Sequence, residues 1–286
     1  MKIGAYIQLT KPRITVFILM STAIGYFCGA ASGSWSWLVC LHALLGTALM
    51  ASGTAALNQW YEREADAKMA RTSSRPLPSG TISSTSAALF GALLSIMGFA
   101  ELWMGANLIT ALLGLFTLAS YLFLYTPLKQ RSPHSTTVGA VPGAMPPLIG
   151  FAAAAGTLTW EAWVLYAILF VWQFPHFYAI AWMYRNDYAK AGIRMLPVVE
   201  PDGKSTSRQI LMFALLLIPV SLAPRFLATA GNLYLVGALV LGAGLLWASF
   251  RVASQRMMPQ ARYILLATVI YLPVLYGLLL LDHRSI

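Results

Sequence analysis

Three oxygen-bearing side chains recur at every fourth position just after a long apolar stretch. They are Asn58, Glu62 and Asp66. If the apolar stretch is a helix that continues to this point, side chains four residues apart lie on one face of it. Carboxylates at a helix C-terminus oppose the helix dipole and need a cation nearby. Mg²⁺ is usually held by one or two carboxylates together with substrate phosphates, so this pattern predicts a metal and diphosphate site.

Basic residues close to these acids leave a plainer interpretation open. Arg63 and the cations from Lys68 to Arg75 could simply pair with the acids at a solvated helix end. A second basic turn contains Lys129 and Arg131, and such turns beside a membrane often set topology or contact lipid headgroups. Beside an acidic metal site, however, the same cations are suited to hold a diphosphate, because Arg donates two parallel hydrogen bonds and Lys supplies a point charge.

A third group of polar and aromatic residues lies inside an apolar segment, from Trp172 to Tyr178. Pro175 removes one helical hydrogen bond and is expected to kink this segment and open a cavity. His176 is an ionisable group at an apolar depth, where such groups usually have a role. A neutral histidine that bonds to a neighbouring helix is the alternative. The aromatic rings suit packing, but their faces would also stabilise an allylic cation.

The elements that carry these residues are predicted to be transmembrane helices. The 286 residues are 58% hydrophobic and only 10% charged, whereas soluble domains are nearer half apolar and a quarter charged. No charged residue occurs between Ile14 and Tyr61, a length that holds two spans of roughly 20 residues. We predict an all-α integral membrane protein with a single domain, 1–286, and about nine transmembrane helices in one bundle. The predicted spans are 14–31, 37–57, 84–104, 107–126, 137–155, 162–183, 209–228, 232–250 and 263–281.

The basic residues predict the orientation of this bundle. With the N-terminus in the cytoplasm and the C-terminus outside, 17 of the 19 Lys and Arg residues fall in cytoplasmic segments, and only Arg225 and Arg284 fall outside. The active site is therefore expected to open to the cytoplasmic side, where the polar loops 58–83 and 184–208 lie. The net charge of +10 is explained by topology and does not indicate a nucleic-acid partner. Cys28 and Cys40 are interpreted as packing residues, with a disulfide left open.

Several motifs together resemble those of a known family of intramembrane enzymes. The chain is similar to the aromatic prenyltransferases related to 4-hydroxybenzoate polyprenyltransferase, and within them to the protohaem IX farnesyltransferase (haem O synthase) branch. The similarity runs from the N-terminus to about residue 200, and the last third agrees only in being helical and apolar. The segments that carry it are Leu9–Ile14, Asn58–Gly80, Tyr125–Arg131, Gly139–Gly150 and Trp172–Pro197.

The resemblance implies a reaction and a cellular setting. The farnesyl group of farnesyl diphosphate would be transferred to a vinyl group of haem b, with addition of water, to give haem O, and Mg²⁺ would assist ionisation of the diphosphate. The expected location is a bacterial inner (plasma) membrane. The expected partners are the two substrates and the lipid bilayer, with a haem A synthase or a terminal oxidase assembly as protein partners.

The resemblance also implies roles for individual residues. The wider family often has Asp at the position of Glu62, and it usually repeats Asp in the region where this chain has Asp187 alone. His176 falls in a Trp-Gln-Phe-Pro-His segment typical of the haem-using branch, so the predicted haem contacts are His176, Trp172 and Tyr178. The predicted metal ligands are Asn58, Glu62, Asp66 and Asp187, which with Lys129 form the predicted catalytic set. The predicted diphosphate ligands are Lys68, Arg71, Arg75, Lys129, Arg131 and Arg185.

Two other functions remain as alternatives. A prenyltransferase with the same fold could use a quinone precursor or chlorophyllide in place of haem, because a fold does not determine the acceptor. A transporter would be expected to hold ionisable residues near the bilayer midplane and to show inverted repeats. This chain gathers its charges towards one face, which favours an enzyme over a transporter.

Overall fold

The computed structural model describes residues 3–30, 35–255 and 259–283. Within these ranges the chain is helical apart from turns and an isolated bridge between Ala230 and His283. Lys2, Arg256 and Arg284, which were used to predict orientation, lie outside the described residues, as does the 31–34 part of the first predicted connection.

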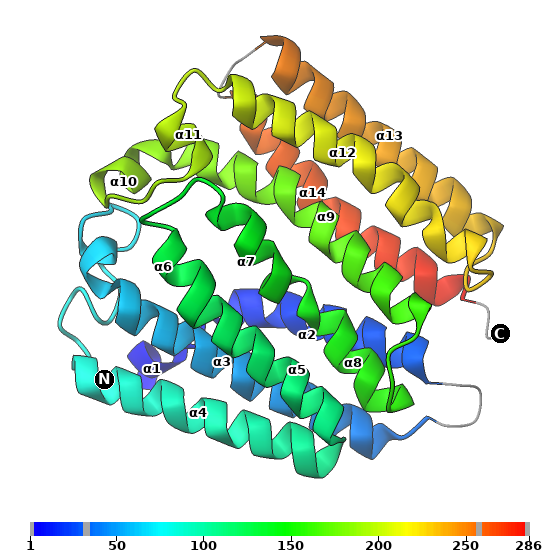
Figure 1. Ribbon diagram of the computed structural model, residues 1–286, viewed down its shortest axis with the longest axis horizontal. Helices are drawn as coiled ribbons and strands as arrows, with labels where there is room; N and C mark the ends of the chain where they lie inside the picture. The colour runs from blue at the N-terminus through cyan, green and yellow to red at the C-terminus, as the bar shows by residue number, and fades with distance from the viewer. Residues whose placement is uncertain (1–2, 31–34, 256–258, 284–286) are drawn as a thin grey trace.

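Nine helical segments in the described ranges are long and apolar enough to cross a membrane, which is the number expected from the sequence. Figure 1 shows the long helices packed side by side in one bundle. The main elements are α1 (Ile3–Leu9), α2 (Pro12–Gly29), α3 (Trp37–Ala67), α4 (Ser84–Gly105), α5 (Leu108–Ala119), α6 (Thr126–Leu128), α7 (Ser135–Gly143), α8 (Met145–Ala155), α9 (Trp160–Met183), α10 (Arg185–Lys190), α11 (Leu196–Val199), α12 (Lys204–Phe226), α13 (Asn232–Gln255) and α14 (Pro259–Leu281).

Three helices differ from the predicted spans in ways that affect the site. Helix α3 has 31 residues and continues ten residues past the predicted end at 57, so it carries the acidic stripe as regular helix. The fourth span changes from α5 into a π-helix, Ser120–Tyr125, before α6. The fifth span is divided at Ala144 into α7 and α8, next to Pro142 inside α7 and Pro146 at the start of α8.

Helices α2 and α8 approach each other unusually closely. A Cβ atom added to Gly25 would collide with the carbonyl oxygen of Pro147, and one added to Gly150 would collide with the carbonyl oxygen of Thr22. Small residues allow such contact in membrane bundles, where van der Waals packing drives helix association. This contact fixes two of the walls of the cavity described below.

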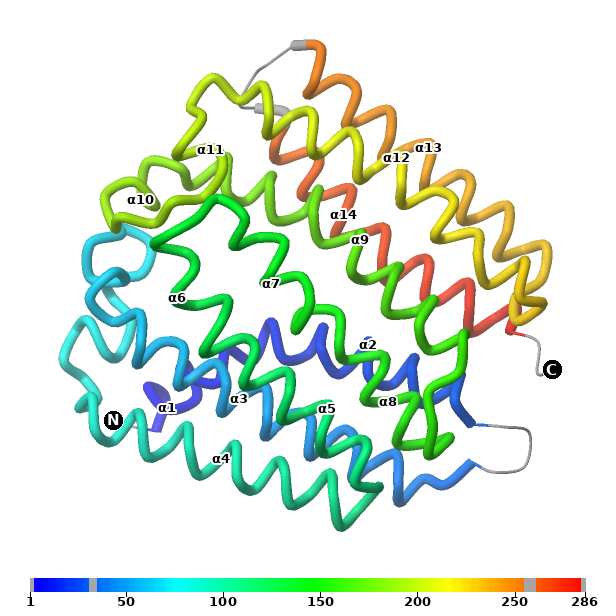
Figure 2. The backbone as a smooth tube through the Cα atoms, viewed as in Figure 1, coloured from blue at the N-terminus to red at the C-terminus, as the bar shows by residue number. Residues whose placement is uncertain are grey.

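The two ends of the bundle differ. One end, here called the carboxylate end, carries the last turns of α3, the 68–83 segment, α10 and α11, while the C-terminus lies at the other end (Figure 1). The tube in Figure 2 shows the chain leaving α9, turning through α10 and α11 and entering α12. Ala65 and Met69 of the α3 end pack against Ala181, Ile193 and Met195, so the segment after α9 covers the end of α3.

Candidate functional site

The acidic stripe of α3 lies inside the protein. Asn58 and Asp66 are each only 1% exposed, and Glu62 is largely buried beside them. Their spacing of four residues places them along one face of α3, as the sequence predicted. An exposed acid on the same helix, Glu64, pairs with Arg63 at 3.3 Å, with 83% of its side chain accessible. The solvated helix end considered above therefore describes Glu64 but does not describe the stripe.

Each polar group of the stripe is matched to a cation. Asn58 Oδ1 accepts a hydrogen bond from Lys11 Nζ at 3.1 Å. Glu62 Oε1 accepts from Lys129 Nζ at 2.8 Å. Asp66 Oδ2 accepts from Arg75 Nη1 at 2.7 Å. Three cations and two carboxylates thus face one another in a largely buried cluster, a composition suited to an anionic ligand together with a metal ion.

The return of Arg75 to Asp66 follows from the turn after α3. Thr72 Oγ1 donates to the carbonyl oxygen of Asp66 at 2.8 Å and satisfies an acceptor at the helix end. The chain then folds back over three further residues, which brings the guanidinium against the carboxylate. This turn links Arg75, one of the predicted diphosphate ligands, to the acidic stripe.

Lys11 is a site residue that the sequence reasoning did not assign. It precedes α2 in the left-handed region, with φ 48° and ψ 58°, a conformation that costs a non-glycine residue free energy and is often found at functional sites. Burial, with help from Arg75 and Lys129, lowers the pKa of Lys11 to about 8, although Glu62 and Asp66 act in the opposite direction. The Lys-Pro pair directly before the first span was the available signal.

Lys129 remains protonated despite its burial. Burial acts to lower the pKa of Lys129, but the Glu62 carboxylate and two nearby tyrosines outweigh this and raise it well above the usual value. Its Nζ atom also lies 4.5 Å from the ring centroid of Tyr125. Its carbonyl oxygen accepts from the backbone N–H of Arg194 at 2.7 Å, which ties the segment after α9 to this turn.

The π-helix places the residue that connects the fourth span to the stripe. Thr126 Oγ1 donates to the carbonyl oxygen of Tyr121 at 2.8 Å and accepts from Asn58 Nδ2 at 3.2 Å. The widened turn supplies the carbonyl group that this hydroxyl contacts. Single π-helical turns are frequent at functional sites because they redirect a few side chains without ending the helix.

A cavity of about 770 Å³ extends from the charged cluster into the bundle. Lys11 belongs to both the cavity wall and the charged cluster, and Tyr121 of the wall lies near Lys129 of that cluster. The remaining lining is mostly apolar. On α3 the lining reaches Thr47, roughly 16 Å of helical rise from Asn58. The site can therefore take a ligand with a charged head and a long apolar tail.

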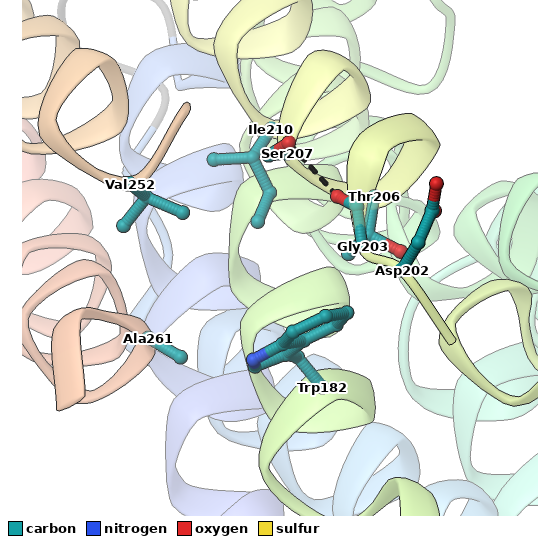
Figure 3. Close-up of a pocket in the computed structure, with 8 residues that line it drawn as sticks. All are labelled: Trp182, Asp202, Gly203, Thr206, Ser207, Ile210, Val252 and Ala261. Carbon is teal, nitrogen blue, oxygen red and sulfur yellow. Dashed lines mark hydrogen bonds between the residues drawn. The ribbon is translucent and has the colours of Figure 1, made fainter. Parts of the chain in front are cut away.

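A second, smaller pocket lies between α9 and the segments from α12 to α14 (Figure 3). Its lining differs from that of the cavity beside the charged cluster. Trp182, Ile210, Val252 and Ala261 give it an apolar lining. Asp202 at its edge bonds to the backbone N–H of Lys204 at 3.0 Å and is half-exposed. The hydrogen bond drawn in Figure 3 is local to α12, from Ser207 Oγ to the carbonyl oxygen of Gly203 at 2.8 Å. Asp202 also pairs with Lys204 Nζ at 3.5 Å, and both side chains are exposed, unlike the buried charges of the stripe.

The other predicted diphosphate ligands lie farther out. Lys68 and Arg131 are exposed. The Arg71 guanidinium lies 4.8 Å from the ring centroid of Tyr184 and thereby joins the loop after α3 to the start of α10. Arg185 stacks over Trp182 at 4.8 Å. Asp187 is half-buried in the first turn of α10, on the segment that covers the end of α3.

The predicted haem contacts face a different part of the bundle. His176 Nδ1 lies 3.0 Å from Thr268 Oγ1, and Trp172 Nε1 donates to the Thr268 carbonyl oxygen at 2.8 Å. Both rings therefore contact α14 and stack on each other, with centroids 4.8 Å apart. Tyr178 is buried in an apolar cluster with Phe174. Helix α9 continues through Pro175, and no described residue of α9 lines the 770 Å³ cavity, so this cavity is not the one predicted at Pro175.

Comparison with known proteins gives consistent matches along the chain. Residues 18–269 match the model of the UbiA prenyltransferase family. Among curated relatives, a protoheme IX farnesyltransferase of Solibacter usitatus is 62% identical over 98% of this chain and 99% of its own length. One with the same name from Koribacter versatilis is 48% identical over 97% of this chain and 93% of its own length.

Solved structures show the same fold at low sequence identity. A structure of digeranylgeranylglyceryl phosphate synthase superposes with a TM-score of 0.81 at 18% identity, covering 98% of each chain. A UbiA homologue from Archaeoglobus fulgidus, bound to DMAPP and Mg²⁺, superposes with a TM-score of 0.70 at 18% identity, covering 96% of this chain and 98% of its own.

Proposed function

The chain belongs to the UbiA prenyltransferase family, and from this premise we propose that it transfers the farnesyl group of farnesyl diphosphate to a vinyl group of haem b, with addition of water, to form haem O. The family expected from the sequence motifs is thereby confirmed. The choice of haem as acceptor is supported by full-length relatives that carry the name protoheme IX farnesyltransferase.

The observation that carries the proposal is the buried cluster of matched charges at the mouth of an apolar cavity. The cations that reach the stripe can exchange their carboxylate partners for diphosphate oxygens. The apolar lining below them suits a farnesyl chain, whose burial is favoured by about 0.8 kcal/mol per CH₂ group. The two ends of one substrate therefore have separate, adjoining sites.

The residues of the stripe fit Mg²⁺ as the resident metal. Two carboxylates and one amide oxygen on one helix face are hard oxygen ligands, and each carboxylate keeps a second oxygen beyond the one bonded to its cation. When bound, Mg²⁺ would supply positive charge that offsets the charge of the diphosphate. Asn58, Glu62 and Asp66 would hold it, with Asp187 as a ligand from the covering segment.

The side chains of the protein stabilise the charge that develops as the bond to the prenyl carbon breaks. The electron pair of that carbon–oxygen bond leaves with the diphosphate, and Lys11, Arg75 and Lys129 donate to its oxygens. The vinyl π electrons of haem then form the new carbon–carbon bond to the allylic cation. Water adds to the resulting cation beside the porphyrin and loses a proton, which gives the hydroxyethylfarnesyl group. The aromatic faces of Tyr121 and Tyr125, near the cations, can stabilise the first carbocation.

We place the haem acceptor at His176, with Trp172 and Tyr178 as further contacts. The bond from Nδ1 to Thr268 orients the imidazole and leaves Nε2 as the nitrogen for an axial iron ligand or for a base that activates water. Trp172 stacks on the same ring and stiffens this arrangement. Thr268 thus joins the predicted haem contacts as a positioning residue.

The remaining features of the proposal concern the cellular setting. The bundle is an integral membrane protein, and we propose that it lies in a bacterial inner membrane with the carboxylate end in the cytoplasm. A haem A synthase or a terminal oxidase assembly would receive the product. The support for this orientation is the sequence distribution of Lys and Arg.

The direct test is incubation of membranes that contain this protein with haem b, farnesyl diphosphate and Mg²⁺, followed by mass analysis of the haem. Haem carrying one added farnesyl group and one added water is expected, and the product should be absent when a chelator removes the metal. A parallel incubation with a quinone precursor or chlorophyllide tests the acceptor. If either compound is prenylated and the haem of the first incubation stays unmodified, the choice of haem is overturned.

A further inference from the structure

Three metal-ligating side chains meet at the end of the bundle opposite the carboxylate end. Cys28 lies in the last turn of α2, Glu161 in the first turn of α9 and His283 directly after α14. The thiol sulfur, a carboxylate oxygen and a ring nitrogen all lie within 4.8 Å of one another. Figure 1 shows α2, α9 and α14 reaching this end of the bundle together. The helical rise between Lys11 and Cys28, about 26 Å, separates this group from the acidic stripe.

The group is largely enclosed and its members are held in position. Cys28 is 6% exposed, and the side chains of Glu161 and His283 are 21% and 11% accessible. Nε2 of His283 lies 3.2 Å from Oε1 of Glu161, and the ring of Phe27 packs edge-on against the imidazole. The segment before His283 is anchored because Asp282 accepts backbone hydrogen bonds from Gly231 and Tyr234.

We propose that Cys28, Glu161 and His283 bind a divalent transition-metal ion of the Zn²⁺ class. Sulfur and imidazole nitrogen favour such ions, whereas Mg²⁺ and Ca²⁺ require oxygen ligands. A thiolate, a carboxylate and a neutral imidazole carry two negative charges, which a dication cancels, so the loaded site is neutral where the helices meet the apolar region. Binding releases the thiol proton to solvent, and the fourth tetrahedral position is open to water.

The geometry requires only a small adjustment. Ligand atoms around tetrahedral zinc are about 3.3–3.8 Å apart, given bond lengths of about 2.0–2.3 Å. The nitrogen and oxygen are already at this separation, so the Cys28 sulfur must move by about an ångström at most. A simple ion pair between His283 and Glu161 explains two members of the group but gives no reason for a thiol at the same point.

Titration of the purified full-length protein with Co²⁺ tests the site, because a sulfur ligand adds an intense near-ultraviolet charge-transfer band. The acidic stripe contains no thiol, so metal bound there is silent in this band. We expect the band to saturate at one Co²⁺ per chain and to disappear when Zn²⁺ displaces that ion. Cys28→Ser should abolish the band, and His283→Asn or Glu161→Gln should weaken binding at least about tenfold, since losing even an outer-shell partner of a ligand costs that much.

Cys40 provides the matched control, because it is the other buried free cysteine, near the same end of the bundle but outside the group. Cys40→Ser should bind Co²⁺ as the parent protein does. Each variant is first checked for an unchanged elution volume and metal-free thermal transition. The Zn²⁺-dependent rise of that transition in the parent protein is a second readout. A parent protein with neither the band nor the rise, or a Cys28→Ser variant that retains both, would overturn the proposal and leave an ion pair only.

Discussion

The cations that face the acidic stripe come from three different parts of the chain. Lys11 precedes the first span, Arg75 returns from the turn after α3 and Lys129 follows the fourth span. Taking two charges out of water is costly, so a buried ion pair contributes little net stability to the fold. We therefore expect these pairs to have a further role. In the proposed role, the pairs keep the site charged and each cation in position while the site is empty. When a diphosphate binds, the cations exchange their partners on α3 for its oxygens.

The carboxylates of the stripe are expected to be essential for turnover. Glu62→Gln and Asp66→Asn keep a hydrogen-bond acceptor for Lys129 and Arg75 but remove the charge that holds the metal, so the rate should fall by about a hundredfold or more. Alanine is a poorer test, because an unpaired buried cation destabilises the fold by about 3–5 kcal/mol.

Glu64→Gln is the matched control, because Glu64 lies on the same helix but is exposed. It should retain the parental rate within about twofold, since surface substitutions usually change free energies by less than about 0.5 kcal/mol. Near-parental turnover of either stripe variant at saturating Mg²⁺ would contradict the proposed metal site.

The ammonium group of Lys11 predicts an alkaline limit for substrate capture. Its pKa of about 8 refers to the substrate-free protein, and the charged form binds the diphosphate, so kcat/KM for farnesyl diphosphate should fall about tenfold per pH unit above about 8. Lys11→Arg should keep the charge at high pH and remove this decline. Lys11→Met should lower kcat/KM at neutral pH and flatten the profile.

Lys190→Met serves as the control for Lys11, because Lys190 is exposed near the same end of the bundle and has no predicted role in the site. Its pH profile should match that of the parent protein. An unchanged alkaline decline in Lys11→Arg would mean that another group determines it.

At the scale of elements, the fourth and fifth spans depart from regular α-helix where they pack against their neighbours. The π-helical turn before α6 and the division between α7 and α8 both lie next to the cavity. Helix α9 bonds to α7 through Gln173 Nε2 and the Ala140 carbonyl oxygen at 3.0 Å, and to α14 through Thr268. These contacts connect the diphosphate side of the bundle with the proposed haem side.

Thr126→Val tests the π-helical contact, because valine keeps the shape but removes the hydroxyl. The buried Asn58 amide would lose its acceptor, which is expected to cost about 1–3 kcal/mol of stability and to lower turnover by letting Asn58 rotate. Thermal unfolding and steady-state rates measure the two effects. Thr126→Ser should restore both.

Thr117→Val is the control, since Thr117 also lines the cavity but bonds only within its own helix, to the Leu113 carbonyl oxygen. If Thr126→Val and Thr117→Val have the same thermal stability and the same turnover rate, the contact between Thr126 and Asn58 does not contribute to function.

His176→Ala is predicted to separate the two substrates. Diphosphate affinity should be unchanged, because His176 contacts α14 and not the stripe, while haem binding is lost or the reaction stops before hydration. An iron-ligand role changes the haem absorption spectrum in the variant, whereas a base role leaves the spectrum and alters the product.

Thr268→Val removes the hydrogen-bond partner of His176 but keeps the imidazole. It should reduce haem-dependent activity less than His176→Ala does, since losing such a partner costs about 10–100-fold in comparable sites. Normal haem binding, product and rate in His176→Ala would show that His176 is a packing residue.

At the scale of the whole molecule, the two ends of the bundle have different chemistry. The carboxylate end holds oxygen ligands and basic residues, and the opposite end holds the cysteine, glutamate and histidine group. If the carboxylate end faces the cytoplasm, the two sites lie in different compartments, and each would meet a different supply of metal ions.

The orientation predicts that residue 70, in the turn after α3, is cytoplasmic. Ala70 is exposed, so Ala70→Cys in a background of Cys28→Ser and Cys40→Ser gives a single accessible thiol at this position. An impermeant thiol reagent should label it only after the membrane is opened. A cysteine placed at exposed Thr157, at the opposite end, should react in intact cells. The reverse pattern would invert the proposed topology.

The sequence by itself determined the elements and much of the chemistry. Apolar runs longer than the hydrocarbon thickness must form helices in a bilayer, because their backbone groups have no other hydrogen-bond partners, and this gave the number of spans. The four-residue spacing gave the oxygen-rich face of α3, since helical periodicity is a local property. The motifs also indicated the family, which the comparisons bear out.

Only the tertiary structure decided which side chains meet. Lys11 and Asn58 are 47 residues apart, and the pairing of Glu62 with Lys129 spans 67. The group of Cys28, Glu161 and His283 joins three helix ends. Such contacts depend on how the helices cross, and in a bilayer the crossing is set by close packing at small residues such as Gly25 and Gly150, which hydropathy does not report. For the same reason the cavity beside the charged cluster is lined by α2, α3 and α8 and not by α9, because the packing of neighbouring helices determines where space remains.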